Sequence, residues 1–278
     1  MDYVEVTFNL FPRQPWADIL IAQLADIGFD SFEETDSGFK AYIEGSGFDE
    51  NELKDVIPEI LKKEGKYTYK VKTINDENWN QVWESNFEPV LIDDKCYIRA
   101  PFHESNPAVA YEIIIEPKMS FGTGHHETTS LMVKWLFEID LKGKTALDMG
   151  CGTGVLAILA SKLGASKITA IDNYIYAYEN TIENVERNFC KNINTVLGDA
   201  SALGKEKFDV IIANITKNVL LDDMEKYDSV LNKGGVILFS GFFDDDKNQI
   251  EAKASDLGLA YKGIKNEKEW ASLCFIKK

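Results

Sequence analysis

The sequence predicts an α/β protein: a large, doubly wound domain with a mainly parallel sheet, preceded by a small ferredoxin-like α+β domain. From residue 145 onward, short apolar runs alternate with amphipathic segments, as strands and helices of a parallel sheet do. The first seventy-odd residues instead follow the order β-α-β-β-α-β. A chain of 278 residues, 45% of them apolar, is long enough for two such cores.

The small domain is expected over residues 1–74. Val4, Val6 and Phe8 alternate toward one face, as in a half-buried strand. We find no catalytic constellation in this domain and expect it to recognise a partner. Its elements, in chain order, are a strand over 3–10, a helix over 15–28, strands over 30–35 and 38–45, a helix over 49–65 and a strand over 67–74.

A linker helix is expected over residues 75–92. Trp79, Trp83 and Phe87 recur every four residues and so share one helical face. The favoured interpretation is that this face packs the helix onto one domain. The alternative is an aromatic surface that contacts substrate.

The large domain is expected over residues 93–278. Two strands and a helix that begins near Thr129 come before its parallel sheet, and the acids Asp244–Asp246 are expected to cap a late helix. The expected strands cover 95–102, 111–117, 145–150, 166–172, 193–199, 207–215, 234–241, 259–269 and 270–278, and the helices between them cover 154–164, 174–190, a segment ending near 231, and 243–258.

The overall composition of the chain argues against several classes of protein. No run of about 18 apolar residues exists, and the start of the chain does not look like a signal peptide. The four cysteines form no CxxC pair, which argues against a zinc site or disulfides and suits reduced thiols in the cytoplasm. The net charge of −16 makes general nucleic-acid binding unlikely. It suits a basic partner, or it serves only solubility.

The stretch "TALDMGCGTGVLAILA", residues 145–160, predicts a strand, a glycine loop and a helix that together bind a nucleotide-like ligand. An NAD-type G-x-G-x-x-G fingerprint would need glycine where Val155 stands, and no Gly-Lys-Ser/Thr follows as in a P-loop. Asp148 precedes the loop. A carboxylate there would disfavour a pyrophosphate and favour a cationic sulfonium.

Three polar residues are expected at the same sheet edge as Gly150 and Gly152. Asp172 ends the second strand and is placed to accept hydrogen bonds from ribose hydroxyls. Asp199 follows the third strand and could meet an adenine amino group, or it could simply cap a turn. Asn214 ends the fourth strand, although it too could be a turn residue. This set fits S-adenosyl-L-methionine, with no metal.

Upstream, "EPKMSFGTGHHETTSLMVKWL" is a polar, glycine-rich loop that runs into a helix. It is placed to fold over the methionine end of the cofactor. Thr128 or Thr129 could bind the cofactor, or either could cap the helix. His125 and His126 are adjacent and therefore point to different sides, so structural roles are favoured for them.

The motifs "SFGTGHHETT", "DMGCGTGVLAI", "AID", "FDVIIANI" and "GGVILFSGF", in this order, resemble the PrmA family of bacterial ribosomal protein L11 methyltransferases. The resemblance implies a class I (Rossmann-like) methyltransferase domain. It also implies methylation of lysine side chains and of the N-terminal amine of a basic large-subunit ribosomal protein, recognised by the small domain. The family's cofactor contacts fall on Thr129, Gly150, Asp172 and Asn214. After "AID", the family's usual Asp/Pro-like turn is replaced by "NYIYAYENT".

Asn214 or neighbouring carbonyls are expected to orient the amine, and no general base stands out. Two alternatives stay open: a methyltransferase for a different protein or small-molecule amine, and a non-catalytic module that only binds S-adenosylmethionine. The separate docking domain argues against a small-molecule acceptor. The complete set of cofactor residues argues against a non-catalytic module.

Overall fold

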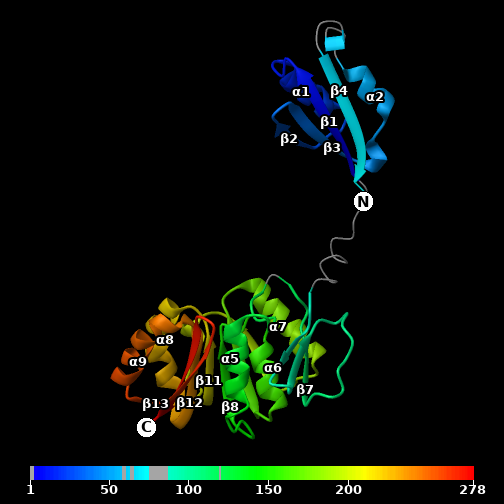
Figure 1. Cartoon of the computed structure of the whole chain (residues 1–278). Coiled ribbons are helices and arrows are strands. Elements are labelled where there is room, and N and C mark those ends of the chain that lie inside the picture. Colours follow the sequence, from blue (N-terminus) through cyan, green and yellow to red (C-terminus); the bar gives the residue numbers. More distant parts are fainter. Residues whose placement is uncertain (1–2, 58–60, 63–65, 75–86, 119) are drawn as a thin grey trace. The chain divides into compact units, whose positions relative to one another are not determined.

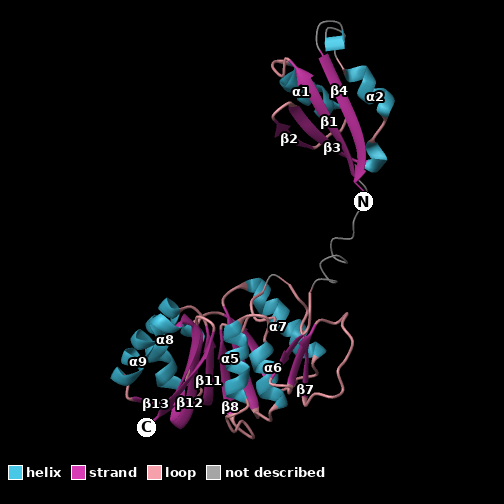
Figure 2. Cartoon of the chain, viewed as in Figure 1, coloured by secondary structure: helices cyan, strands magenta, loops and turns pink. Residues whose placement is uncertain are grey.

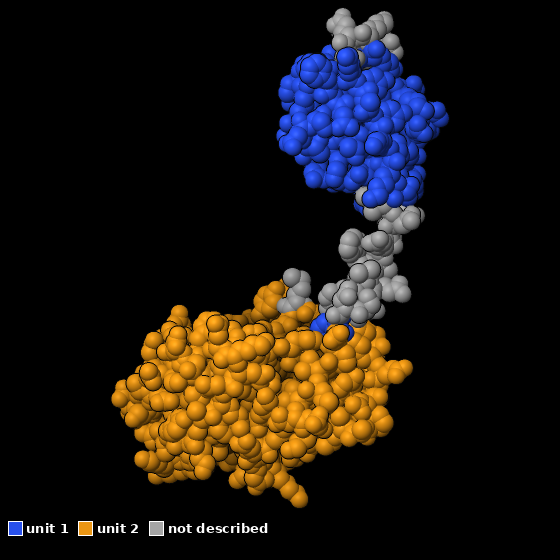
Figure 3. All heavy atoms as spheres, viewed as in Figure 1, with its two compact units in different colours: residues 1–87 blue, residues 88–278 orange. Residues whose placement is uncertain are grey.

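A computed structural model describes residues 3–57, 61–62, 66–74, 87–118 and 120–278. The chain divides into two compact units, residues 1–87 and 88–278, which Figure 3 distinguishes by colour. Most of the predicted linker helix, including Trp79 and Trp83, lies outside the described residues. Residues 90–92, which the sequence assigned to the linker, form a strand of the second unit.

The first unit is a four-stranded antiparallel sheet with strand order β2-β3-β1-β4 (Figure 1). β3 separates β1 from β2, so this is the ferredoxin-like arrangement that the sequence predicts. The elements are β1 (Tyr3–Phe11), α1 (Trp16–Asp26), β2 (Ser31–Thr35), β3 (Gly38–Glu44), the 3₁₀ turn η1 (Gly45–Gly47), α2 (Glu50–Val56) and β4 (Lys66–Ile74).

Alternation along β1 builds the core of the first unit. Val4, Val6 and Phe8 are buried as predicted, and Phe8 stacks on Phe39 with ring centroids 5.1 Å apart. From α1, Leu20 and others close this core. The second helix was predicted over 49–65, and α2 ends at Val56. Asp49 caps the start of α2 by accepting a hydrogen bond from the Asn51 amide.

The second unit contains a seven-stranded sheet of order β10-β9-β8-β11-β12-β14-β13. All neighbouring pairs from β10 to β12 are parallel, and β14 runs antiparallel to both of its neighbours. The predicted doubly wound, mainly parallel sheet is therefore confirmed. The strands are β8 (Thr145–Met149), β9 (Lys167–Asp172), β10 (Ile193–Leu197), β11 (Phe208–Asn214), β12 (Leu231–Phe243), β13 (Leu259–Glu267) and β14 (Trp270–Lys277).

Helices cover both faces of this sheet (Figure 2). One core joins the sheet to α5 and α6, and a second joins it to α8 and α9. None of the described helices is both long enough and apolar enough to cross a membrane. The helices are α5 (Glu127–Leu136), α6 (Val155–Lys162), α7 (Ile175–Arg187), α8 (Lys217–Val230) and α9 (Lys247–Asp256), with 3₁₀ turns η2 (Ala200–Ala202) and η3 (Asp244–Asp246).

A separate three-stranded sheet packs against the α6 side of the large sheet. Its strands are β5 (Val90–Ile92), β6 (Cys96–Arg99) and β7 (Tyr111–Ile114), of which the last two were predicted.

Burial raises the pKa of the Cys96 thiol to about 12 and that of Cys274 to about 11. Both thiols therefore stay protonated and unreactive near neutral pH.

Candidate functional site

A cavity of about 460 Å³ opens at the carboxyl ends of the parallel strands, beside β8. There the chain order reverses, since β9 lies on one side of β8 and β11 on the other. This is where open α/β sheets bind their ligands. The lining residues that carry the argument below are Ser120, Phe121, His126, Thr128, Gly150, Gly152, Asp172, Tyr174, Asp199, Asn214, Ile215, Asp223, Gly241 and Trp270.

The glycine loop is fixed by close backbone packing. Gly150 and Gly152 have φ values of +70° and +57°. A Cβ on Gly150 would lie 2.1 Å from Cγ2 of Ile215, and one on Gly152 would lie 2.2 Å from the carbonyl oxygen of Phe121. Only glycine combines these backbone angles with such close neighbours. The predicted loop therefore forms.

The upstream loop lies directly against the glycine loop. The Thr153 amide donates to the carbonyl oxygen of Phe121 at 2.9 Å, and the Thr153 hydroxyl donates to that of Gly122 at 2.6 Å. Ser120 and Phe121 line the cavity. The sequence placed this loop over one end of a ligand, and its position beside the cavity suits that role.

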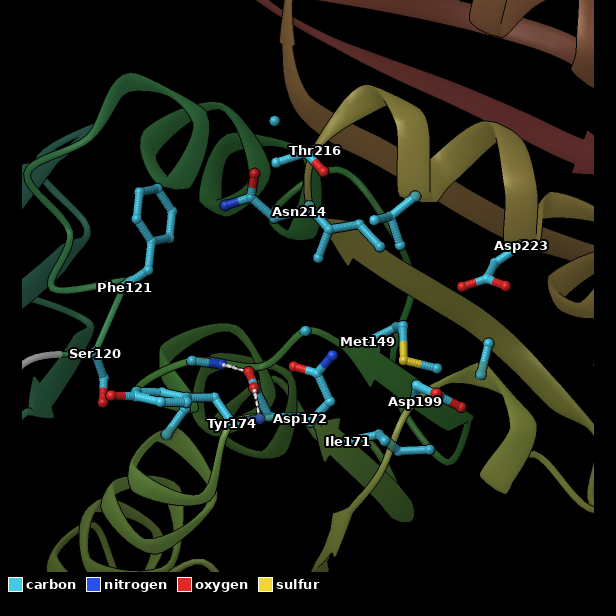
Figure 4. Close-up of a pocket in the computed structure, with 18 of the residues that line it drawn as sticks. Ser120, Phe121, Met149, Ile171, Asp172, Tyr174, Asp199, Asn214, Thr216 and Asp223 are labelled. Carbon is cyan, nitrogen blue, oxygen red and sulfur yellow. Dashed lines mark hydrogen bonds between the residues drawn. The ribbon is translucent and has the colours of Figure 1, made fainter.

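Asp172 joins the glycine loop to the turn that follows β9. Its Oδ2 accepts a hydrogen bond from the Gly152 amide at 2.9 Å, and its Oδ1 accepts one from the Tyr174 amide at 3.0 Å (Figure 4). The carboxylate therefore has a set orientation at the end of β9, with acceptor positions still open toward the cavity.

Asp199 caps a turn, which is one of its two predicted roles, and it also lines the cavity. Its Oδ1 accepts a hydrogen bond from the Ser201 amide at 2.7 Å, at the start of η2. Hydrogen bonds from the Ser201 hydroxyl and amide hold the pKa of the Asp199 carboxyl below its usual value. The side chain is therefore an anionic acceptor near neutral pH.

Asn214 ends β11 at the cavity, as predicted. Its Oδ1 is buried and finds no hydrogen-bond partner among the described residues. The Ser120 hydroxyl, also on the cavity wall, is in the same state. Buried oxygens without partners are costly in a folded protein. Both positions therefore suit a ligand that carries hydrogen-bond donors.

Thr128 lines the cavity, whereas Thr129, the predicted cofactor contact, lies next to it in the first turn of α5 and is not among the lining residues. The cofactor contact of Thr129 therefore stays a prediction. Thr129 is fully buried, and its Oγ1 has no hydrogen-bond partner among the described residues.

The two adjacent histidines do point to different sides. His125 Nε2 lies 2.8 Å from the carbonyl oxygen of Glu88. His126 caps α5, because its Nδ1 accepts a hydrogen bond from the Thr128 amide at 3.2 Å.

Asp148 does not reach the ligand, contrary to the expectation that its carboxylate favours a sulfonium. It is 1% exposed, and its Oδ2 accepts a hydrogen bond from the Ala157 amide at 3.0 Å. Side chains alternate along β8, so Asp148 falls on the face beneath α6. Burial, and secondarily the charge of Asp172, raise the pKa of its carboxyl to about 7, although the Ala157 hydrogen bond opposes this.

Several cavity residues escaped the sequence interpretation. Ile215 is wedged between two glycines: its Cγ2 faces Gly150, and its carbonyl oxygen would lie 2.3 Å from a Cβ on Gly241. The glycine of "LFSGF" is the only local signal for that contact. Trp270 and Tyr174 reach the cavity from β14 and from the turn before α7.

The charges of the lining residues are unevenly distributed. The carboxylates that line the cavity are Asp172, Asp199 and Asp223. Figure 4 shows Asp199 and Asp223 at the end opposite Phe121 and Asn214. Phe121, His126 and Trp270 add aromatic rings to the same lining. Within the described ranges, no group of three or more His, Cys, Asp or Glu side chains is arranged to hold a metal ion.

A family model described as "Ribosomal protein L11 methyltransferase (PrmA)" matches residues 27–278. A ribosomal protein L11 methyltransferase of Phocaeicola vulgatus is 44% identical over 281 residues, covering 100% of both chains. One from Porphyromonas gingivalis is 45% identical over 287 residues, covering 99% of this chain and 98% of its own.

Among solved structures, a ribosomal protein L11 methylase from Lactobacillus delbrueckii subsp. bulgaricus is similar with a TM-score of 0.65 and 28% identity. The match covers 69% of this chain and 100% of that one. The matched proteins thus share sequence along nearly the whole chain, and the solved structure shares the fold. The chain belongs to the PrmA family of methyltransferases.

Proposed function

We propose that this enzyme transfers methyl groups from S-adenosyl-L-methionine to amines of ribosomal protein L11, at lysine side chains and at the N-terminus. The observation that carries the proposal is the convergence of the glycine loop, Asp172 and Asn214 on one cavity at the carboxyl edge of the sheet. Family membership supports methyl transfer, and the names of the relatives support the substrate.

The cavity residues fit S-adenosylmethionine. In this proposal the backbone of Gly150 and Gly152 contacts the ligand, and Asp172 accepts hydrogen bonds from the ribose hydroxyls. Asp199 accepts from the adenine amino group. Asn214 stands at the methionine end together with Thr129, whose buried Oγ1 has no partner among the described residues, and with the cavity-lining Thr128. S-adenosylmethionine supplies a methyl group on a sulfonium, a donor that needs no further activation.

The protein's task is then to hold a neutral amine in line with the methyl group. A free lysine amine has a pKa of about 10.4 and is mostly protonated at neutral pH. Phe121, His126 and Trp270 line the cavity with aromatic rings, so moving the amine out of water beside them lowers its pKa and releases the proton to solvent. The unpaired Oδ1 of Asn214 accepts a hydrogen bond from the amine and orients it.

The charge distribution supports a basic protein as the acceptor. Residues 1–87 contain 18 acidic and 8 basic side chains, whereas residues 88–278 contain 28 and 22. Ribosomal proteins are basic, and complementary charge speeds encounter. We place recognition of ribosomal protein L11 in the 1–87 unit and the reaction in the cytoplasm, where ribosomal proteins are made.

The test is intact-mass spectrometry of purified ribosomal protein L11 after incubation with the enzyme and S-adenosylmethionine. The matched control is Asp172→Ala, which removes the acceptor of the Gly152 and Tyr174 amides. Mass increments of one methylene per transfer, absent with the control, support both donor and substrate.

Two other outcomes separate the alternatives. If calorimetry shows S-adenosylmethionine binding but L11 gains no mass, the acceptor is a different amine, or the protein binds the cofactor without catalysis. If no binding is detected, the assignment of the cavity is wrong.

A further inference from the structure

Four aromatic rings form a continuous arc at the Phe121 end of the cavity. Neighbouring ring centroids are 5.1 Å apart from Phe121 to His126, 4.6 Å from His126 to Trp270, and 4.3 Å from Trp270 to Phe243. The first three rings line the cavity, and Phe243 backs the indole. We call these four residues the aromatic arc.

Fixed backbone holds the arc in place. His126 is the N-cap of α5, and Phe121 belongs to the segment that the Thr153 amide anchors. Trp270 and Phe243 are cross-strand partners where β14 meets β12. The arc therefore gathers residues from three distant parts of the sequence.

Exposure of the arc is unusual for apolar side chains. Phe121, which lines the cavity, is 54% exposed, and Phe243, which packs against Trp270, is 46% exposed. Isolated exposed rings are common on protein surfaces, but a row of rings in contact beside a binding cavity marks a contact surface. The ligand for such a surface must be apolar, cationic, or both.

Charge around the arc identifies the ligand. The carboxylates of the cavity come from β9, from the turn after β10 and from α8, none of which carries an arc residue. Glu127 lies beside His126 but forms an ion pair with Lys268, so the attraction of the arc for a cation comes from the ring faces. An attraction of that kind needs no N–H group on the cation.

We propose that the aromatic arc is a cage for the acceptor amine that binds its methylated forms as well as the free amine, which lets one site serve successive methyl transfers. This inference rests on the proposed function. Each methylation replaces an N–H by an N–CH₃ and removes a hydrogen bond that Asn214 could accept. Attraction to the ring faces survives that loss, so the cage retains mono- and dimethylated acceptors.

The test compares two probes on the full-length protein with S-adenosylhomocysteine present. One is N-acetyl-trimethyllysine amide, and the other is its uncharged isostere with carbon in place of nitrogen. The wild-type protein should bind the cation about threefold to thirtyfold more tightly than the isostere, as calorimetry measures. The preference should fall toward one in Trp270→Leu and in Phe121→Leu, and persist in Trp270→Phe.

The matched control is Phe189→Leu, because Phe189 is 86% exposed and lies outside the cavity. It should keep the wild-type preference. Equal binding of the two probes by the wild-type protein overturns the cage. So does a cation preference that survives both Trp270→Leu and Phe121→Leu. If Trp270→Leu does not fold, the half-exposed Phe121 provides the same comparison.

A second readout follows products by intact mass. With ribosomal protein L11 as substrate, Trp270→Leu should accumulate singly and doubly methylated amines, whereas equal slowing of every step contradicts the cage. The two proposals fail differently. A cation preference without L11 methylation removes the substrate and keeps the cage. L11 methylation without a cation preference keeps the substrate and removes the cage.

Discussion

Asp148 is a carboxyl group that the fold encloses beneath α6, where it accepts a hydrogen bond from an amide of the first helical turn. Burial raises its pKa to about 7, from about 3.9 in an unfolded chain. Between these values the folded protein holds a proton that the unfolded chain has lost. The free energy of unfolding therefore falls as pH rises through this window, and the full cost is present above about pH 7.

Asp148→Asn should remove this dependence, because the amide oxygen can still accept the Ala157 hydrogen bond but never ionises. The variant should gain stability relative to wild type as pH rises from 5 to 7, by at most about 1.4 kcal/mol per pH unit. Urea denaturation at several pH values measures the difference. The exposed Asp256 offers the control Asp256→Asn. A stability difference that stays constant with pH would refute the argument.

Asn214 presents the opposite case, a polar group that stability does not require. Its Oδ1 has no partner among the described residues, so Asn214→Ala breaks no hydrogen bond there and should leave the melting temperature within a few degrees of wild type. Turnover of ribosomal protein L11 should fall about a hundredfold, because the amine loses its orienting acceptor. Steady-state kinetics test the predicted loss of turnover, and thermal melts test the unchanged melting temperature. A well-folded variant with near-normal turnover removes Asn214 from the mechanism.

Among the elements, the glycine loop and the upstream loop behave as one unit. The carbonyl oxygen of Phe121 accepts from Thr153 and sits where a Cβ on Gly152 would project. Gly152→Ala should therefore push the two loops apart and force a left-handed alanine, at a cost of about 2 kcal/mol. Calorimetry should show S-adenosylmethionine binding weakened at least tenfold, since both loops form the cavity wall.

Gly204→Ala is the matched control, because a Cβ there meets nothing within 4 Å and φ is not positive. It should leave cofactor binding and stability unchanged. Equal, small effects of the two substitutions would mean that the loops move independently and that their contact has no part in binding.

The elements themselves were predictable, but the directions of several side chains were not. The spacing of apolar residues and the positions of the glycines located β8, α6 and the glycine loop. They also placed Asp172 and Asn214 at the same edge of the sheet. They could not show that Asp148 faces α6, because strand alternation fixes two faces without saying which helix covers which. The choice between Thr128 and Thr129 depends on how α5 docks. Trp270 joins the cavity only because β14 inserts beside β12.

At the scale of the whole molecule, negative charge is concentrated in the unit without the cavity. Residues 1–87 hold 18 of the 46 acidic side chains but only 8 of the 30 basic ones. The sheet of this unit divides them further. Edge strand β2 carries Glu33 and Glu34, whereas the opposite edge strand, β4, carries three exposed lysines, Lys66, Lys70 and Lys72.

This distribution predicts how salt and charge should affect capture of a basic substrate. Raising the salt concentration from about 0.05 M to 0.3 M should lower kcat/KM for ribosomal protein L11 about tenfold, because the field that steers it is screened beyond a Debye length. Binding of S-adenosylmethionine, measured by calorimetry in the same buffers, should change much less, since its contacts lie within the cavity.

Two charge variants with opposite signs make the prediction sharper than salt alone. Replacing Glu33 and Glu34 by Gln should lower kcat/KM at low salt, and replacing the three β4 lysines by Gln should raise it, with kcat unchanged in both. Each difference should shrink at high salt, because steering acts on encounter and not on the reaction. If both variants shift kcat/KM in the same direction, or if the shifts persist at high salt, the acidity of this unit serves solubility and the substrate is captured by shape.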